Sequence, residues 1–261
     1  MKDIKSMVIK VGTSTLTYDT GLINLRRIEV LSRVLSDIKN KGIKPILVSS
    51  GAIGVGVGKL GLSERPNTTS EKQAVAAIGQ VELMKIYSKF FGEYGTTVAQ
   101  VLLTKDVLDG EFREANAKNT FKTLLNLGVV PIVNENDTIS TYEIEFGDND
   151  SLSAYVAQLV NADTLVILTD IDGLYDSDPH TNKDAKLIEY VENVTEELFE
   201  CAGGTGTKRG TGGMKTKLNA VTVANAVGTD VIITNGKNPE VLYKIADGEK
   251  VGTFFKGREI L

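Results

Sequence analysis

Short apolar runs alternate along the chain with longer segments in which apolar residues recur every three or four positions. Short, mostly apolar runs bounded by turn residues are typical of strands that are buried on both faces. Such runs occur at 7–11, 45–48, 97–103, 129–133, 164–168 and 230–234. Helical spacing predicts helices at 24–40, 53–60, 73–91, 111–127, 151–160, 214–227 and 238–246. Strands that alternate with helices predict an α/β fold: a three-layer αβα sandwich around a mostly parallel sheet.

Local signals refine several of these helices. Gly42 is expected to cap the C-terminal end of the first long helix. The pattern Ser70-Glu71-Lys72-Gln73 is read as a capping box that opens the helix at 73–91. The small residues at 74–80 predict close packing of this helix against another one, in the same chain or across a subunit interface. Three alternating glycines, Gly54, Gly56 and Gly58, fall within a helix and miss the dinucleotide-binding spacing, which favours helix packing.

The length of 261 residues allows one large domain or two small ones. The loosely alternating residues 139–146 are expected to form a hairpin. The polar stretch at 170–190 is the best candidate for a boundary between two lobes.

Composition and charge narrow the class of protein. Apolar residues make up 41% and charged residues 24%, which is ordinary for a soluble globular protein. The net charge of -5 argues against a nucleic-acid binder, and no apolar run approaches the length of a membrane span. The single Cys201 excludes an internal disulfide and a cysteine metal cluster. These properties, together with the lack of a signal peptide, predict a cytoplasmic protein.

Lys10 interrupts the first apolar run close to its end, and Gly12 follows it. A buried ammonium is costly unless it meets an anion, and ligands of open α/β sheets bind at the carboxyl ends of strands. Gly12 would let the backbone approach such a ligand and present its N–H groups. One interpretation is therefore that both residues meet a phosphate. The alternative is that Lys10 reaches solvent from an edge strand.

A second glycine-rich turn, at 211–213, directly opens the helix at 214–227. Lys215 and Lys217 lie in the first turn of that helix, where a cation opposes the helix dipole unless an anion neutralises it. With Lys208 and Arg209 just upstream, an anion-binding site is favoured over a flexible surface loop.

A polar and acidic cluster is the counterpart of these cations. Asp137 follows a strand, and Asn149 and Asp150 stand at a helix start. Asp148, Asn149 or Asp150 could simply be the N-cap of that helix. The only histidine, His180, lies in a polar turn and is expected to be exposed. No histidine-based general base is therefore evident. A carboxylate acceptor of a phosphoryl group needs no such base, because it is already ionised at pH 7.

Several stretches together resemble the amino acid kinase family, and within it the branch that phosphorylates L-glutamate. They follow the order of the family over nearly the whole chain, and as a set they are highly specific. The matching stretches are Lys10-Val11-Gly12-Thr13-Ser14, Ser49-Ser50-Gly51-Ala52, 73–80, Asn134-Glu135-Asn136-Asp137, 146–150, 169–175 and 210–217.

The resemblance implies ATP-dependent phosphorylation of the side-chain carboxylate of L-glutamate to γ-glutamyl phosphate, the first intermediate of proline synthesis. It implies catalytic roles for Lys10, Lys217, Asp150, Gly12 and Gly51. The implied substrate-binding residues are Ser50, Asp137, Asn149 and Asn134. The implied nucleotide-binding residues are Lys10, Thr169, Asp170, Thr211, Gly212, Gly213, Met214, Lys215, Thr216 and Lys217. Mg²⁺ is expected to arrive on the ATP phosphates, without a metal site made by the protein.

The same resemblance implies a single domain, 1–261, with an amino-acid-binding lobe at about 1–165 and a nucleotide-binding lobe at about 166–261. Many members continue into a C-terminal RNA-binding-like module called PUA, which is expected to be absent because the sequence ends at Leu261. A homo-oligomer, dimer or tetramer, is implied, and L-proline, a common feedback inhibitor in the family, is the expected inhibitor. Two alternatives stay open: a kinase of the same fold acting on aspartate, N-acetylglutamate or UMP, and a non-catalytic nucleotide or amino-acid sensor.

Overall fold

Strand β1 (Ser6–Val11) lies inside an eight-stranded sheet of the computed structural model, paired in parallel with β2 (Lys44–Ser49) and β5 (Thr164–Thr169). The order of the strands is β3-β4-β2-β1-β5-β7-β8-β6. The structure describes residues 3–18, 22–107, 110–140, 149–179, 181–201 and 213–259.

The remaining strands are β3 (Val98–Leu103), β4 (Val130–Glu135), β6 (Tyr190–Val191), β7 (Asp230–Asn235) and β8 (Thr253–Phe255). All neighbouring strands are parallel except β7 and β8, which are antiparallel. The mostly parallel sheet predicted from the apolar runs is therefore confirmed, and the two short strands β6 and β8 extend it at one edge.

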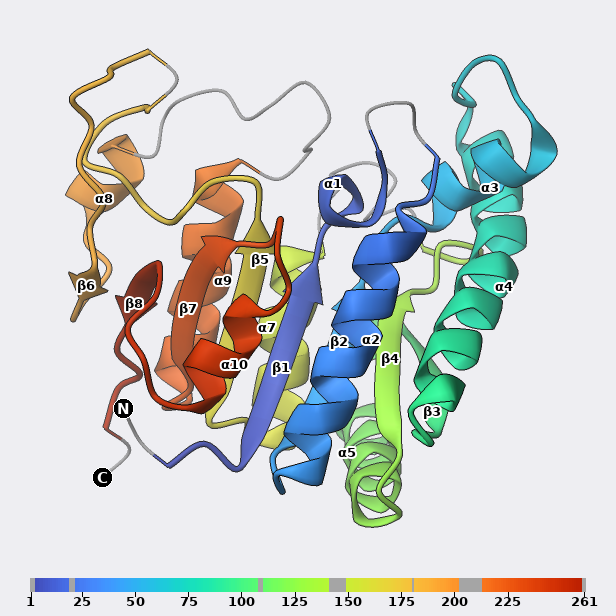
Figure 1. Cartoon of the computed structure of the whole chain (residues 1–261), viewed down its shortest axis with the longest axis horizontal. Coiled ribbons are helices and arrows are strands. Elements are labelled where there is room, and N and C mark those ends of the chain that lie inside the picture. Colours follow the sequence, from blue (N-terminus) through green and yellow to red (C-terminus); the bar gives the residue numbers. More distant parts are fainter. Residues whose placement is uncertain are drawn as a thin grey trace.

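Helices cover both faces of this sheet (Figure 1). Helices α5 (Glu111–Asn126), α7 (Asp150–Val160) and α9 (Met214–Ala226) pack on one face, and α2 (Leu25–Asn40), α4 (Thr69–Glu93) and α10 (Val241–Ala246) pack on the other. The short helices are α1 (Thr13–Leu16), α3 (Ala52–Leu60), α8 (Glu196–Cys201) and the 3₁₀ turn η1 (Lys105–Val107). The three-layer αβα architecture is thus as predicted.

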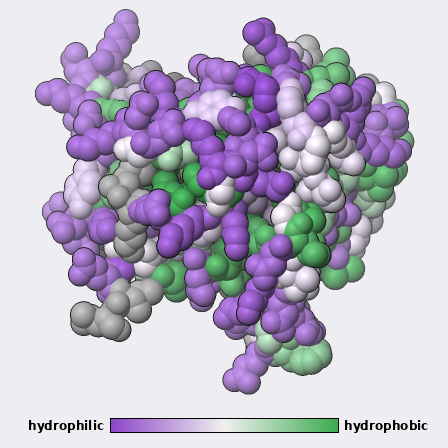
Figure 2. Space-filling model, turned by 60° about the horizontal axis from the view of Figure 1, so that its bottom comes forward, coloured by the Kyte–Doolittle hydropathy of each residue, from purple (hydrophilic) through white to green (hydrophobic). Residues whose placement is uncertain are grey.

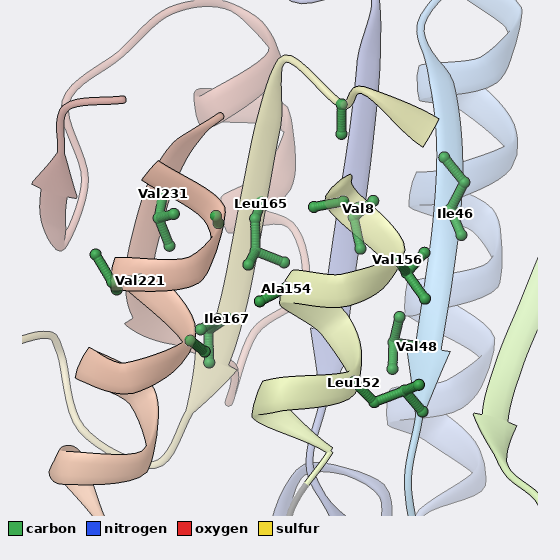
Figure 3. Close-up of a cluster of buried hydrophobic side chains, with 14 of the residues drawn as sticks. Val8, Ile46, Val48, Leu152, Ala154, Val156, Leu165, Ile167, Val221 and Val231 are labelled. Atoms are coloured by element: carbon green, nitrogen blue, oxygen red, sulfur yellow. The ribbon is translucent and has the colours of Figure 1, made fainter. Parts of the chain in front are cut away.

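Alternate residues of each strand supply two apolar cores, one on each side of the sheet. On β1, Val8 belongs to the core beneath α7 and α9, whereas Met7, Ile9 and Val11 belong to the core beneath α2 and α4. Figure 3 shows the first of these cores, in which Leu152 and Val156 of α7 lie against the sheet. Because side chains alternate between the two faces of a strand, Lys10 shares the face of Val8 and lies on the side of α7 and α9.

Helices α3 and α4 are in direct contact because glycines remove side chains from their interface. A Cβ on Gly79 of α4 would come within 1.8 Å of the Ala52 carbonyl oxygen, and a Cβ on Gly56 of α3 within 2.1 Å of the Val75 carbonyl oxygen. The close packing predicted from the small residues is therefore confirmed within one chain. The predicted capping box was misplaced: the structure pairs Thr68 with Glu71, so that α4 begins at Thr69.

Several large apolar side chains are exposed, among them Phe112, Leu127 and Ile139. On the face seen in Figure 2, hydrophilic residues predominate and hydrophobic ones form small patches between them. Among the described residues, no helix combines the length and hydropathy that a membrane crossing requires. Most of the predicted hairpin at 139–146, and His180, lie outside the described residues.

Candidate active site

Polar side chains from four adjacent strands meet at one edge of the sheet. The strands β4, β2, β1 and β5 are neighbours in this order and run parallel, so their carboxyl ends lie side by side. Lys10 stands one residue before the end of β1, and Thr169 ends β5. Ser50 directly follows β2, and Asn134 lies next to the last residue of β4. Ligands of open α/β sheets bind at this edge.

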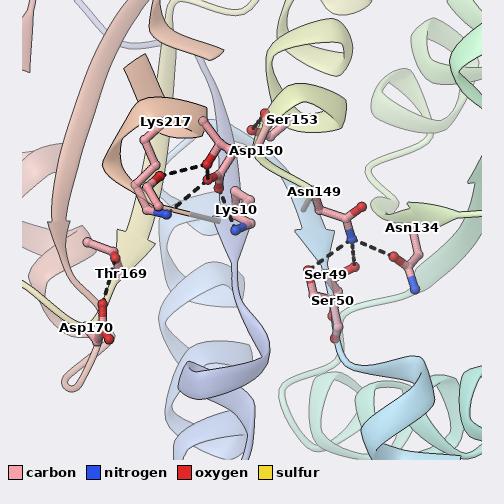
Figure 4. Close-up of polar contacts among 12 residues, drawn as sticks. Lys10, Ser49, Ser50, Asn134, Asn149, Asp150, Ser153, Thr169, Asp170 and Lys217 are labelled. Carbon is pink, nitrogen blue, oxygen red and sulfur yellow. Dashed lines mark hydrogen bonds and ion pairs between the residues drawn. The ribbon is translucent and has the colours of Figure 1, made fainter. Parts of the chain in front are cut away.

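Two lysines from opposite ends of the sequence share one carboxylate there (Figure 4). The Nζ of Lys10 lies 2.5 Å from Oδ1 of Asp150, and the Nζ of Lys217 lies 3.0 Å from Oδ2 of the same residue. The hydroxyl of Thr216 donates to Asp150 Oδ2 at 3.2 Å. Asp150 is fully buried, and each lysine is only 6% exposed. The interpretation of Lys10 as a lysine that reaches solvent from an edge strand is therefore wrong.

This cluster concentrates two positive charges at the end of a buried strand. Burying charged groups costs free energy even when they are paired, so an apolar core does not explain the arrangement. Two ammonium groups on one carboxylate are suited to a ligand group with several negative oxygens, such as a phosphoryl group in transfer. Asp150 fixes their positions from the first turn of α7.

The two predicted glycines lie in the turns that follow β1 and β2. A Cβ on Gly12 would lie 3.7 Å from the Nζ of Lys10, so the lack of a side chain leaves the lysine head open on that side. Gly51 has a φ of 102°, a left-handed conformation that favours glycine, and it starts α3. Gly12 therefore adjoins the lysine cluster, whereas Gly51 lies against Leu16 and Thr13. The roles of both glycines in catalysis stay predictions.

A network of carboxamide side chains lies on the side of β1 that faces β2 and β4, away from β5. The Asn149 amide nitrogen donates to the Ser49 carbonyl oxygen at 3.0 Å, to the Ser50 hydroxyl at 3.0 Å and to Asn134 Oδ1 at 2.8 Å. The Asn134 amide nitrogen donates in turn to Gln80 Oε1 of α4 at 2.9 Å. Asn149 occupies the N-cap position of α7, but its side chain makes no capping hydrogen bond. The N-cap alternative thus does not explain its side chain.

Oδ1 of Asn149, in this network, and Oδ1 of Asp137, two residues beyond the end of β4, are buried and have no hydrogen-bond partner among the described residues. Asp137 is 6% exposed. Burial, and secondly the neighbouring charge of Glu135, raises the pKa of the Asp137 carboxyl to about 7. Unsatisfied buried acceptors are costly, and both of these atoms suit a ligand that donates N–H groups.

The residues predicted to bind the nucleotide differ in whether the structure describes them and in what they contact. Thr169 is buried at the end of β5 and donates to the Asp170 carboxylate at 3.1 Å. Thr216 and Lys217 contact Asp150, whereas Met214 packs against the apolar core and Lys215 is exposed. Gly213 is the N-cap residue of α9, and Thr211 and Gly212 lie outside the described residues. Their binding of a nucleotide stays a prediction.

Sequence reasoning missed two residues of the site. Gln80 is buried in α4, 54 residues before its partner Asn134, and only its place at the end of the stretch 73–80 could have drawn attention to it. Glu135 lies between two predicted residues but received no role, although its charge contributes to the raised pKa of Asp137.

Comparisons with known proteins identify the family and the fold. The model of the amino acid kinase family matches residues 5–235. A UMP kinase structure from Bacillus anthracis superposes with a TM-score of 0.66 at 17% identity, covering 100% of this chain and 99% of that one. An isopentenyl phosphate kinase from T. acidophilum superposes with a TM-score of 0.59 at 20% identity, covering 96% and 100%. These two structures support the fold alone.

The chain belongs to the amino acid kinase family. A glutamate 5-kinase from Clostridium perfringens is 61% identical over 99% of this chain and 98% of its own length. A glutamate 5-kinase from Listeria innocua is 54% identical over 99% and 95%, and one from a Thermoanaerobacter species is 55% identical over 95% of this chain and 67% of its own length. Within the family, the chain therefore groups with the glutamate 5-kinases.

Proposed function

We propose that this protein transfers the γ-phosphoryl group of ATP to the γ-carboxylate of L-glutamate, forming L-glutamyl 5-phosphate in the first step of proline biosynthesis. The observation that carries the proposal is the buried Lys10–Asp150–Lys217 cluster at the carboxyl ends of the parallel strands. Thr169 lies on one side of this cluster and Asn149 on the other. The whole-length similarity to glutamate 5-kinases supports the choice of substrate.

The two lysines would stabilise the phosphoryl group as it moves from the ADP oxygen to the carboxylate oxygen. The acceptor is ionised at neutral pH, so no general base has to remove a proton from it. Negative charge accumulates where two anions approach each other, and fixed ammonium groups lower that barrier without rearranging. Asp150 would act by holding both lysines at the reacting group.

Nucleotide binding would involve the end of β5 and the start of α9. Thr169 and Asp170 lie on the β5 side of Lys10, and Thr216 lies one residue before Lys217. Mg²⁺ on the ATP phosphates would supply further charge neutralisation. Among the described residues, no three carboxylate, histidine or cysteine side chains gather as a metal site. We propose that the ATP phosphates are the main ligands of the ion.

Recognition of glutamate would depend on the two buried acceptors. The α-ammonium group can donate to Asp137 and to Oδ1 of Asn149, which both need a donor. Its positive charge would also lower the raised pKa of Asp137 and keep that carboxyl ionised. Ser50 would contribute its hydroxyl. An N-acetylated amino acid has no such charge, which is why we favour a free amino acid as substrate.

We further propose two lobes, about 1–165 for the amino acid and about 166–261 for the nucleotide, in a cytoplasmic homo-oligomer. Ile78 and Val81 of α4 are 41% and 57% exposed, which supports this helix as an assembly surface. Inhibition by L-proline is proposed because an amino group on proline could reach the same acceptors.

A hydroxamate-trapping assay with ATP, Mg²⁺ and a panel of acids tests the proposal. Hydroxylamine captures an acyl phosphate, so colour should develop with L-glutamate and stay at background with aspartate and N-acetylglutamate. ADP release with UMP is measured in parallel, because UMP forms no acyl phosphate. Turnover with another acid or with UMP, and none with glutamate, would refute the choice of substrate. Binding of both ligands without any turnover would instead indicate a sensor.

A further inference from the structure

We infer that Gln80 is a positioning residue for the amino-acid substrate, which acts through the carboxamides of Asn134 and Asn149 without touching the substrate. The inference deepens the proposed function and rests on it. The three side chains form one line of hydrogen bonds from α4 to the edge of the sheet. All three are buried, with exposures of 8%, 1% and 0%.

The hydrogen bonds define which end of each amide faces which neighbour. The backbone N–H of Glu135 donates to Oδ1 of Asn134 at 2.9 Å, so this end of the Asn134 amide is the oxygen. The other end is therefore the NH₂ group, which needs an acceptor, and Gln80 Oε1 provides it at 2.9 Å. With both ends bonded, Asn134 has one orientation.

That orientation determines how Asn149 lies. Its NH₂ group faces two oxygens that can only accept, Oδ1 of Asn134 and the carbonyl oxygen of Ser49. The Oδ1 of Asn149 must then point away from them, and it is buried without a partner among the described residues. Figure 4 shows the Asn149 nitrogen turned toward Ser50 and Asn134, with the oxygen on the opposite side. Asn149 thus presents an acceptor to the substrate amine.

Helix packing fixes the position of Gln80 itself. The preceding residue, Gly79, lies against the Ala52 carbonyl oxygen so closely that no Cβ fits. Ala52 begins α3 immediately after Ser50 and Gly51, so α4 is locked to the turn that borders the site. Gln80 therefore transmits the position of α4 to the amides that bind the substrate.

Two variants separate this role from a space-filling one. Gln80→Glu keeps an oxygen that can accept from Asn134, whereas Gln80→Met keeps the length and removes the acceptor. Gln80→Met should raise KM for glutamate about tenfold, which corresponds to about 1.4 kcal/mol, with kcat and KM for ATP nearly unchanged. Gln80→Glu should stay within about threefold of the wild type, since the hydrogen bond from the Asn134 amide is retained.

Ser32→Ala is the matched control, because Ser32 is buried in α2 and makes one hydrogen bond, at 2.9 Å, to the Ile28 carbonyl oxygen of the same helix. It should lower the melting temperature and leave KM for glutamate unchanged. Equal KM values for Gln80→Met and Gln80→Glu, or a loss confined to kcat, would overturn the inference.

A second measurement is available if Gln80→Met is poorly stable. In an Asn134→Ala background the relay, meaning the line of hydrogen bonds from Gln80 through Asn134 to Asn149, is already broken. Gln80→Met should therefore have no further effect on glutamate binding. Binding is measured by calorimetry with glutamate alone. Additive losses would refute the relay. Wild-type turnover with glutamate is measured first, because its absence would refute the proposed function, whereas normal wild-type turnover with an unaffected Gln80→Met would refute only the relay.

Discussion

Asp137→Asn is expected to stabilise the substrate-free protein at neutral and alkaline pH while abolishing its response to glutamate. The Asp137 carboxyl has its pKa raised from 3.8 to about 7, first by burial and then by the charge of Glu135. A raised folded-state pKa contributes stability that is complete at low pH and is lost as the pH rises to about 7. Asparagine has no proton to lose, so the variant escapes this loss.

The size of the effect follows from the two pKa values. Between them the unfolded chain has released the proton and the folded chain has kept it, so the wild type loses about 1.4 kcal/mol of stability per pH unit relative to the variant. From pH 5 to pH 7 the advantage of the variant should therefore grow by about 2 kcal/mol, and it should level off above pH 7. For a chain of this size that is roughly 4–8 °C in melting temperature.

Thermal unfolding at pH 5 and pH 8, with and without glutamate, measures both effects. Asp184→Asn is the control, because Asp184 is exposed and lies outside the site. Glutamate should raise the melting temperature of the wild type and of the control but not that of Asp137→Asn. If the difference between Asp137→Asn and the wild type is the same at both pH values, Asp137 is not a buried acid with a raised pKa and the reasoning fails.

Other predictions follow from the same geometry. Lys10→Ala and Lys217→Ala should each lower kcat on the order of 10²-fold or more with little change in KM; steady-state kinetics that showed a change in KM alone would contradict this. KM for glutamate should fall about tenfold from pH 6 to pH 8 as Asp137 ionises, and a flat profile would count against its pairing with the substrate amine. In a melting assay, Gly79→Ala should destabilise the fold by several kcal/mol, because its Cβ would meet a carbonyl oxygen at 1.8 Å. Gly58→Ala should be tolerated, because the nearest atom to its Cβ would be Leu22 Cδ2 at 3.9 Å.

The sheet and its helices could be predicted because each parallel strand is buried on both faces and therefore reads as an apolar run. Helix ends were less predictable. Ser70 and Gln73 have the residue types of a capping box, but Thr68 and Glu71 satisfy the same pattern two residues earlier, and they are the pair that the structure uses. Sequence patterns do not rank two overlapping caps. The short strands β6 and β8 were missed because two or three residues are too few to show alternation.

Site residues could be predicted only where the residue type is unusual for the strand or helix that contains it. Lys10 is such an anomaly, since a charge in a buried strand needs a partner. Its partner could not be derived from the residues, because Asp150 lies 140 positions away and was equally acceptable as a helix cap. Gln80 is no anomaly at all: a glutamine in a long helix is ordinary, and its role depends on which end of a distant asparagine amide faces it. The structure thus adds the direction of the hydrogen bonds, and in a site where three amides meet in series that direction decides whether the substrate encounters a donor or an acceptor.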